Sequence, residues 1–238
     1  MTTTLRPREL LLLAARRLGP LCGRVVFVGG ATTELFVTDP AAPEARATMD
    51  VDVLVDVASY VDYATALRAD LTALGFAEDV REGAPMCRWV HGALVLDVMP
   101  TVGRVLGFTN AWYADAAEHA TTHRLADDVA IRVVTAPHFV ATKIEAWKGR
   151  GEGDFLASRD VEDIVAVVDG RPELPDEVDA AHPKLRTYLA AEIGAWLDQH
   201  DLADVIPCHL SGDAASQARA GLVLERFSRI AGRARERR

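Results

Sequence analysis

The sequence has few cysteines and no long hydrophobic run. Its three cysteines, Cys22, Cys87 and Cys208, are odd in number and far apart, so they form neither a zinc-binding pattern nor a disulfide framework. Such sparse use of cysteine is typical of the reducing cytoplasm. The apolar run Leu10–Leu13 is too short for a membrane span or a signal peptide, and Arg16 follows soon after it. We therefore expect a cytoplasmic protein with no membrane partner.

The chain also lacks an excess of positive charge. Lysine and arginine number 26 against 35 aspartates and glutamates, which gives a formal net charge of −9. A protein that binds nucleic acid indiscriminately is normally basic, so this balance argues against that class, although it allows a local basic patch. Half of the residues are apolar, as in a folded globular protein. One candidate basic patch contains Lys143, Lys148, Arg150 and Arg159.

The most informative feature that is present is the acidic pair Asp50 and Asp52, inside a predicted strand over residues 49–56. Side chains at positions i and i+2 of a strand point to the same face. Two carboxylates on one face repel each other unless a cation neutralises them. Oxygen ligands of this kind suit Mg²⁺, which takes one or two carboxylates and completes its shell with water and nucleotide phosphates.

A glycine pair, Gly29 and Gly30, precedes these acids by some twenty residues. It lies between the apolar run Val25–Val28 and the predicted helix Ala31–Leu35. Glycine lets the backbone approach a phosphate closely, and a helix N-terminus offers free N–H groups to it. A phosphate-binding turn and a metal-binding acid pair together indicate a nucleoside triphosphate with its metal.

A third acid, Asp97, lies in the apolar run Leu94–Pro100. A lone aspartate in such a run is costly to bury unless it is paired or binds a metal. The preceding strand, Met86–Val90, and a turn at His91-Gly92 predict a hairpin. We therefore expect Asp97 near the centre of the sheet with Asp50 and Asp52, where three acids can hold two metal ions.

Gly-Gly, then Asp-x-Asp on a strand, then one Asp on a later strand resembles the active site of the polymerase-β-type nucleotidyltransferase superfamily. Within it the chain looks like the AbiEii/AbiGii toxin-type nucleotidyltransferases of bacterial type IV toxin–antitoxin systems. That narrower resemblance covers roughly residues 22–170 and rests on Gly29–Thr32, Asp50–Asp52, Lys143 and Arg159–Ile164.

The chain departs from the superfamily pattern in two places. Many members have Gly-Ser where this chain has Gly29-Gly30, so a phosphate-binding hydroxyl must come from Thr32 or Thr33, or be absent. The gap before Asp50 is also long, and its stretch Asp39–Pro43 is interpreted as an inserted loop.

The resemblance implies a set of site residues. Mg²⁺ would be held by Asp50, Asp52 and Asp97, which would also be catalytic together with Lys143, Asp160 and Asp163. The nucleoside triphosphate (NTP) would contact Gly29, Gly30, Thr32, Thr33, Lys143 and Arg159. The spacing does not say which of Asp160 and Asp163 acts. From the residues alone, Lys143 could equally be an exposed helix cation, and the two acids could simply favour a helix N-terminus.

The acceptor is implied by the resemblance alone. It points to RNA, notably the 3′ end of tRNA, with a cognate antitoxin as a possible partner. A protein hydroxyl or a small molecule such as an aminoglycoside would use the same chemistry. The rival from another class is a non-catalytic nucleotide-binding interaction module.

The predicted fold class is α/β (α+β). A nucleotidyltransferase core with a mixed sheet and flanking helices is expected over residues 1–135, and a helical C-terminal domain that completes the active site over 136–238. Turn signals and periodicity predict the elements. Helices are expected over 6–18, 60–74, around Trp112, from Pro137 to about Lys148, and over 159–169, 183–200 and 213–235, and further strands over 24–28, 121–125 and 129–134.

Overall fold

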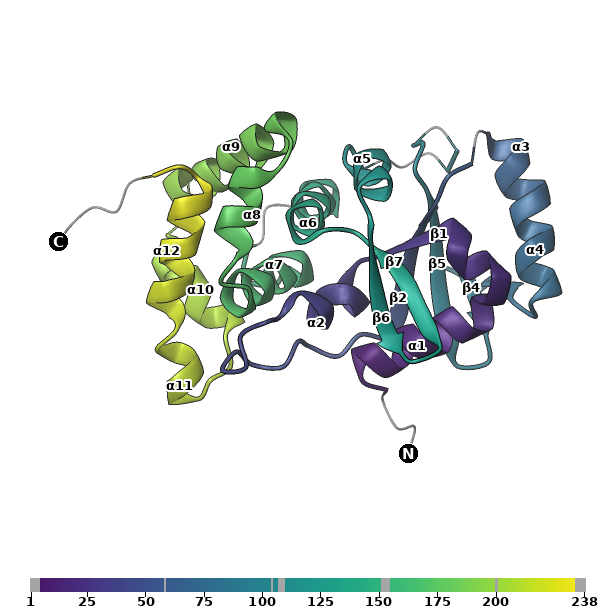
Figure 1. Ribbon diagram of the computed structural model, residues 1–238, viewed down its shortest axis with the longest axis horizontal. Helices are drawn as coiled ribbons and strands as arrows, with labels where there is room; N and C mark the ends of the chain where they lie inside the picture. The colour runs from purple at the N-terminus through teal and green to yellow at the C-terminus, as the bar shows by residue number, and fades with distance from the viewer. Residues whose placement is uncertain are drawn as a thin grey trace. The chain divides into compact units, whose positions relative to one another are not determined.

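The computed structural model describes residues 5–57, 59–103, 105–106, 110–150, 155–199 and 201–233 (Figure 1). The chain forms a mixed α/β structure with one seven-stranded sheet and flanking helices, which confirms the expected fold class. It divides into two compact units. The first contains Met1–Thr32 and Ala47–Thr135, and the second contains Thr33–Arg46 and Ala136–Arg238.

The first unit contains the whole sheet, in the strand order β3-β4-β5-β2-β1-β7-β6. Strands β2 and β5 pair in parallel, as do β1 and β7, and the other neighbours are antiparallel. The sheet is therefore mixed, with β2 and β5 in its interior. The strands are β1 Val25–Val28, β2 Asp50–Val55, β3 Ala77–Glu78, β4 Arg88–His91, β5 Leu94–Pro100, β6 Thr121–Ala126 and β7 Val129–Val133.

Strand β2 shows the alternation that its sequence predicts. Val51 and Val53 are fully buried, whereas Asp50 and Asp52 are half-buried. A strand directs successive side chains to opposite faces, so the two aspartates share the face opposite the valines. The prediction that they lie on one face of a strand is confirmed.

Strands β4 and β5 form the expected hairpin. Gly92 lies in the turn with a φ of 61°, a left-handed conformation that glycine adopts without steric cost. Counting outward from this turn pairs His91 with Leu94 and Arg88 with Asp97. On its other side, β5 pairs with β2 so that Asp97 lies directly beside Asp52.

The helices of the first unit pack apolar side chains around this sheet. Helix α1 begins with Pro7, and the Glu9 carboxylate accepts a hydrogen bond from the Arg6 N–H at 3.0 Å, which caps the first turn. Leu11 and Leu18 of α1 are fully buried. The described helical segments are α1 Pro7–Leu18, η1 Gly19–Arg24, η2 Gly30–Thr32, α3 Tyr60–Asp62, η3 Tyr63–Leu67, α4 Arg68–Ala73 and α5 Tyr113–Glu118.

The second unit is helical in its described residues. Its helices are α2 Thr33–Phe36, α6 Ala136–Arg150, α7 Arg159–Gly170, α8 Leu174–Ala180, α9 Pro183–Gln199, α10 Leu202–His209, α11 Ala214–Gln217 and α12 Ala220–Ile230 (Figure 1). Ser158 caps α7 by accepting a hydrogen bond from the Val161 N–H. Among the described helices of the chain, none has both the length and the apolar character to cross a membrane.

Segment Thr33–Arg46 precedes β2 in the chain but belongs to the second unit. The Phe36 and Phe139 rings pack with centroids 4.9 Å apart. The carbonyl of Gly170 accepts hydrogen bonds from the backbone N–H groups of Thr38 and Asp39, at 2.8 and 2.9 Å. These contacts explain why the stretch that the sequence identifies as an inserted loop groups with the C-terminal helices.

Two helical regions differ from the sequence expectation. No helix is expected between residues 169 and 183, but helix α8 starts at Leu174, because proline is tolerated in the first turn of a helix. The single helix expected over 213–235 is instead α11 and α12, with a turn at Ala218–Arg219 that contains neither glycine nor proline. The last residues of that expected helix lie outside the described part of the chain.

Candidate active site

The first unit brings together the three carboxylates that the sequence singles out. Asp52 of β2 and Asp97 of β5 are direct neighbours across the parallel pairing of these interior strands. Asp50 lies one step along the same face of β2 and accepts a hydrogen bond from the Thr48 hydroxyl at 3.0 Å. The Asp97 side chain is only 10% exposed, whereas that of Asp50 is 37% exposed. The resulting acid cluster is buried at Asp97 and open to solvent at Asp50.

Arg88 lies across this cluster, and sequence reasoning did not identify it. Its Nε and one Nη donate to the two oxygens of Asp97 at 2.8 and 2.7 Å, and the same Nη donates to Asp50 at 3.0 Å. The pKa of Arg88 is raised, first by the hydrogen bond to Asp97 and then by the charges of Asp97 and Asp50. Register counting from Gly92 would have placed Arg88 opposite Asp97.

Gly29 is the residue that lets the backbone approach the acids. Its φ is 78°, and a Cβ atom built on it would lie 1.9 Å from an oxygen of Asp52. Any other residue would therefore displace the Asp52 carboxylate. The turn is closed by Thr32, whose N–H and hydroxyl both donate to the Gly29 carbonyl, at 3.0 and 2.8 Å.

The two threonines that follow the glycine pair are fully buried. The Thr32 hydroxyl is engaged with the Gly29 carbonyl. The Thr33 hydroxyl is buried without a hydrogen-bond partner among the described residues. A phosphate-binding role for either hydroxyl stays a prediction, as does the role of Gly30, which opens the short segment η2.

The second unit gathers a different set of charges around Lys143 of α6. The Lys143 ammonium donates to Asp163 at 2.6 Å and to Asp160 at 3.1 Å. Arg46 donates two hydrogen bonds to Asp163, at 2.8 and 3.0 Å, and Arg150 donates two to Asp160, at 3.0 and 2.9 Å. Three cations thus surround two acids, in an arrangement called here the Lys143 cluster.

The Lys143 cluster is buried at its centre. Lys143, Asp160 and Asp163 are all less than a tenth exposed. This burial excludes the alternative that Lys143 is an exposed helix cation, and both acids contact it. Burial alone would lower the pKa of Arg46, but the charge and hydrogen bonds of Asp163 outweigh it and raise that pKa. Arg46 lies between the predicted loop Asp39–Pro43 and β2, where no sequence pattern indicated a role.

The candidate basic patch is largely neutralised within the second unit. Lys148 donates to Glu145 at 3.0 Å and to Glu192 at 2.8 Å. Arg150 belongs to the Lys143 cluster, and Arg159 is exposed at the first residue of α7. The patch therefore presents less positive charge than its sequence suggests.

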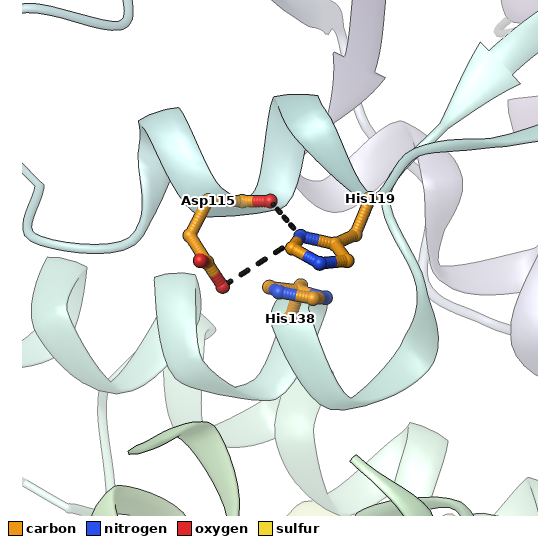
Figure 2. A group of neighbouring side chains, drawn as sticks. All are labelled: Asp115, His119 and His138. Carbon is orange, nitrogen blue, oxygen red and sulfur yellow. Dashed lines mark hydrogen bonds and ion pairs between the residues drawn. The ribbon is translucent and has the colours of Figure 1, made fainter. Parts of the chain in front are cut away.

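Two histidines lie near the ends of helices, one in each unit. Figure 2 shows His119 beside Asp115. His119 follows α5, and its Nδ1 atom lies 2.9 Å from the backbone oxygen of Asp115 and 3.9 Å from the Asp115 carboxylate. Contacts between positions i and i+4 are ordinary on a helix. His138, also labelled, is a buried residue of α6 and belongs to the second unit. We assign these residues no part in catalysis.

The three carboxylates of the first unit fit a divalent metal. They offer hard oxygen donors from adjacent strands, and the guanidinium of Arg88 already lies among them as a cation. Oxygen donors of this type suit Mg²⁺. Such a site, beside a glycine turn whose backbone lies close to the acids, can bind a nucleotide together with its metal.

This sheet belongs to a nucleotidyltransferase-like fold. The chain is similar to the crystal structure of an antigenic nucleotidyltransferase-like protein from Paracoccidioides brasiliensis, with 19% identity, a TM-score of 0.51, and coverage of 85% of this chain and 93% of that chain. It also aligns with JHP933 from Helicobacter pylori at 12% identity and a TM-score of 0.49, over 98% of this chain and 93% of that chain. The second likeness is too distant to add to the first. No protein-family model and no curated protein matches the sequence.

Proposed function

We propose that the protein is a Mg²⁺-dependent nucleotidyltransferase, which moves a nucleoside monophosphate from an NTP to an acceptor hydroxyl. The observation that carries the proposal is the cluster of Asp50, Asp52 and Asp97 on adjacent strands, with the Gly29 turn against Asp52. The acid cluster would supply metal ligands, and the backbone of the turn is proposed to bind a phosphate. The nucleotidyltransferase-like fold is consistent with this chemistry.

Each acid has a role in the proposed reaction. Bound Mg²⁺, held by Asp50, Asp52 and Asp97, would neutralise charge on the phosphates. Asp97 is proposed to accept the proton of the acceptor hydroxyl. The oxygen of that hydroxyl then forms a bond to the α-phosphorus, and the bond from the α-phosphorus to the bridging oxygen breaks, so that pyrophosphate leaves. The Gly29-Gly30 backbone is proposed to bind phosphate oxygens.

Lys143 and Arg159, both in the second unit, are the phosphate-binding cations of the proposal. A cation that contacts the leaving pyrophosphate stabilises the charge that develops there. Asp160 and Asp163 hold the Lys143 ammonium at 3.1 and 2.6 Å, so we propose that both acids position it. Their match to the family motif supports this assignment.

For the acceptor we propose RNA, most specifically the 3′ end of tRNA, and a toxin-like role in which an antitoxin restrains the enzyme. The resemblance of Lys143 and of Arg159–Ile164 to the toxin-type enzymes supports this choice. One observation favours the rival, a silent nucleotide-binding module: Arg88 already neutralises part of the acid cluster.

Label transfer tests the proposal directly. The purified protein is incubated with each α-labelled NTP, Mg²⁺, total cellular RNA and lysate protein, beside Asp52→Asn and the matched control Asp56→Asn, which removes an exposed carboxylate just past β2. We expect transfer by wild type and Asp56→Asn, and a loss of about 10²-fold or more in Asp52→Asn. A tRNA-sized labelled band would identify the acceptor. Nucleotide binding without transfer to RNA or protein would favour the silent module.

Growth tests the toxin-like role separately. Wild type and Asp52→Asn are expressed from the same inducible promoter in a bacterial host. We expect growth arrest with wild type only, because the arrest depends on catalysis. Equal growth of both strains, with transfer intact in the test tube, would contradict the toxin role and leave the transferase in place.

A further inference from the structure

We propose that Arg88 is an internal cation that competes with the divalent metal for Asp50 and Asp97, and thereby sets the metal concentration at which the acid cluster is loaded. This inference rests on the proposed function, because it takes the carboxylates as metal ligands. Arg88 would then be a regulatory residue of the site rather than a catalytic one.

The hydrogen bonds of Arg88 occupy the atoms that a metal needs. One Nη nitrogen donates to an oxygen of Asp97 at 2.7 Å and to an oxygen of Asp50 at 3.0 Å, so it bridges the two carboxylates. The Nε donates to the second oxygen of Asp97 at 2.8 Å. A Mg²⁺ ion would bind the same carboxylate oxygens. The guanidinium and the metal would therefore compete for Asp97.

The charge and exposure of the cluster allow such an exchange. One guanidinium is shared between the carboxylates of Asp50 and Asp97, so this pair keeps a net negative charge that attracts a divalent cation. The Arg88 side chain is 24% exposed, and β4 lies next to the short edge strand β3. A long, flexible side chain at this position can leave the carboxylates for solvent without a change in the sheet.

The opposite role makes the opposite prediction. If Arg88 oriented Asp97 for the metal, as partners of metal ligands often do, its removal would weaken metal binding. If Arg88 competes with the metal, its removal strengthens metal binding. Metal affinity separates the two roles without any measurement of transferase activity.

The test is a titration of the full-length protein with Mn²⁺, followed by the electron paramagnetic resonance signal of free Mn²⁺. Arg88→Gln is compared with wild type and with Arg81→Gln, which removes the same charge from a pair with Asp79 on the neighbouring turn. We expect Arg88→Gln to bind Mn²⁺ about tenfold more tightly, because charge-assisted hydrogen bonds no longer compete. Arg81→Gln should remain within about twofold of wild type, since exposed charges are screened.

The outcomes separate this inference from the proposed function. The Asp97→Asn variant identifies the site, because this variant should lose specific Mn²⁺ binding. Equal or weaker binding by Arg88→Gln, with binding that depends on Asp97, overturns the competition and leaves the metal site intact. Absence of Asp97-dependent binding in every variant overturns the metal site and the competition together.

A second measurement on wild type does not depend on whether Arg88→Gln folds. The Nε–H resonance of Arg88 is followed by ¹⁵N–¹H NMR and assigned with Arg88→Lys. Saturating Mg²⁺ should move this resonance from its hydrogen-bonded position, because the guanidinium leaves Asp97. A resonance that stays in place at saturation contradicts the proposal.

Discussion

Gly29 shows how one missing Cβ atom controls the acid cluster. Gly29 and Gly92 both have positive φ, at 78° and 61°. A side chain at Gly92 meets no atom within 4 Å, whereas one at Gly29 collides with Asp52. Both glycines therefore need a left-handed backbone conformation, but only Gly29 lies too close to a carboxylate to carry a side chain.

We expect Gly29→Ala to lose both stability and metal binding, and Gly92→Ala to lose only stability. The left-handed conformation costs about 1–2 kcal/mol in either variant. Gly29→Ala adds the overpacking of Asp52, about 1–3 kcal/mol more. Urea unfolding measures the first effect and Mn²⁺ titration the second. Equal losses in both variants would mean that the Asp52 carboxylate moves away at no cost.

Cys87, the residue before Arg88, offers a test of thiol reactivity. Burial, and to a smaller extent the charges of Asp97 and Asp52, raise the pKa of its thiol to about 12. A raised thiol pKa keeps the neutral form below that pH, and the neutral thiol is a poor nucleophile. We expect iodoacetamide at pH 8 to modify the exposed Cys208 in the folded protein and to leave Cys87 unmodified until urea unfolds it. Peptide mass spectrometry checks this, and labelling of both cysteines at equal rates would contradict it.

The sequence was sufficient to predict the positions of some residues of the candidate site and not of others. Asp50, Asp52 and Asp97 were predictable, because strand alternation and a tight hairpin convert spacing directly into position. The same count of residues from the turn would have predicted the position of Arg88. The position of Arg46 was not predictable, because it contacts Asp163 from an irregular segment whose path depends on tertiary contacts.

At the scale of elements, α7 is joined to α12 through a charged contact. Arg219, just before α12, donates to the buried Asp169 carboxylate at 2.7 Å, to the Asp169 carbonyl at 3.0 Å and to Asp39 at 2.7 Å. The Asp169 side chain is 2% exposed, so it depends on this partner. By contrast, Arg229 of α12 pairs with Asp176 at an exposed position.

We expect Arg219→Ala to destabilise the second unit by about 3–5 kcal/mol, because it leaves a buried charge without its partner. Arg229→Ala removes an exposed pair from the same helix and should cost about 0–1 kcal/mol. Urea unfolding followed by tryptophan fluorescence compares them, since Trp196 lies in this unit. Similar losses in the two variants would show that Asp169 finds other partners.

The Lys143 cluster joins α6 to α7. Two substitutions at Lys143 distinguish its effect on stability from its effect on catalysis. Lys143→Ala leaves two buried acids with one partner fewer and should cost about 3–5 kcal/mol. Lys143→Arg keeps the charge and should stay folded, but its larger planar group cannot take the place of a compact ammonium. We expect it to lose about 10²-fold in label transfer. Full activity of a folded Lys143→Arg would contradict the phosphate-binding role.

Elements with strong periodicity and caps, such as α1 and α7, were predictable from the sequence. Helix α8 was not predictable, because a proline in the first turn of a helix and a proline that ends a helix look alike in the sequence. The division between α11 and α12 was missed because the turn between them contains neither glycine nor proline.

At the scale of the whole molecule, the sequence predicted a boundary at residue 135. The structure groups Thr33–Arg46 with the C-terminal helices as well. Hydrogen bonds from Thr38 and Asp39 to the Gly170 carbonyl, and the packing of Phe36, hold the segment there. Contacts between residues so far apart in the chain leave no local sequence pattern, so this grouping could not be predicted from the sequence.

The net charge of −9 is distributed so that acids engage part of the basic surface. Lys148 illustrates this, because its ammonium lies within 3.0 Å of both Glu145 and Glu192. Arg159, in contrast, is exposed at the start of α7. A cation that is already paired releases few counterions when RNA binds, and an exposed one releases more.

We therefore expect weak tRNA binding that depends on Arg159 rather than on Lys148. Arg159→Gln should reduce the slope of log affinity against log salt by about one and weaken binding, whereas Lys148→Gln, with the same loss of charge, should change neither. Filter binding of labelled tRNA across a salt series measures both quantities. Equal effects of the two variants would mean that Lys148 leaves its glutamates to contact RNA. A steep slope unaffected by either variant would assign the RNA contacts to another surface and contradict an RNA contact at Arg159.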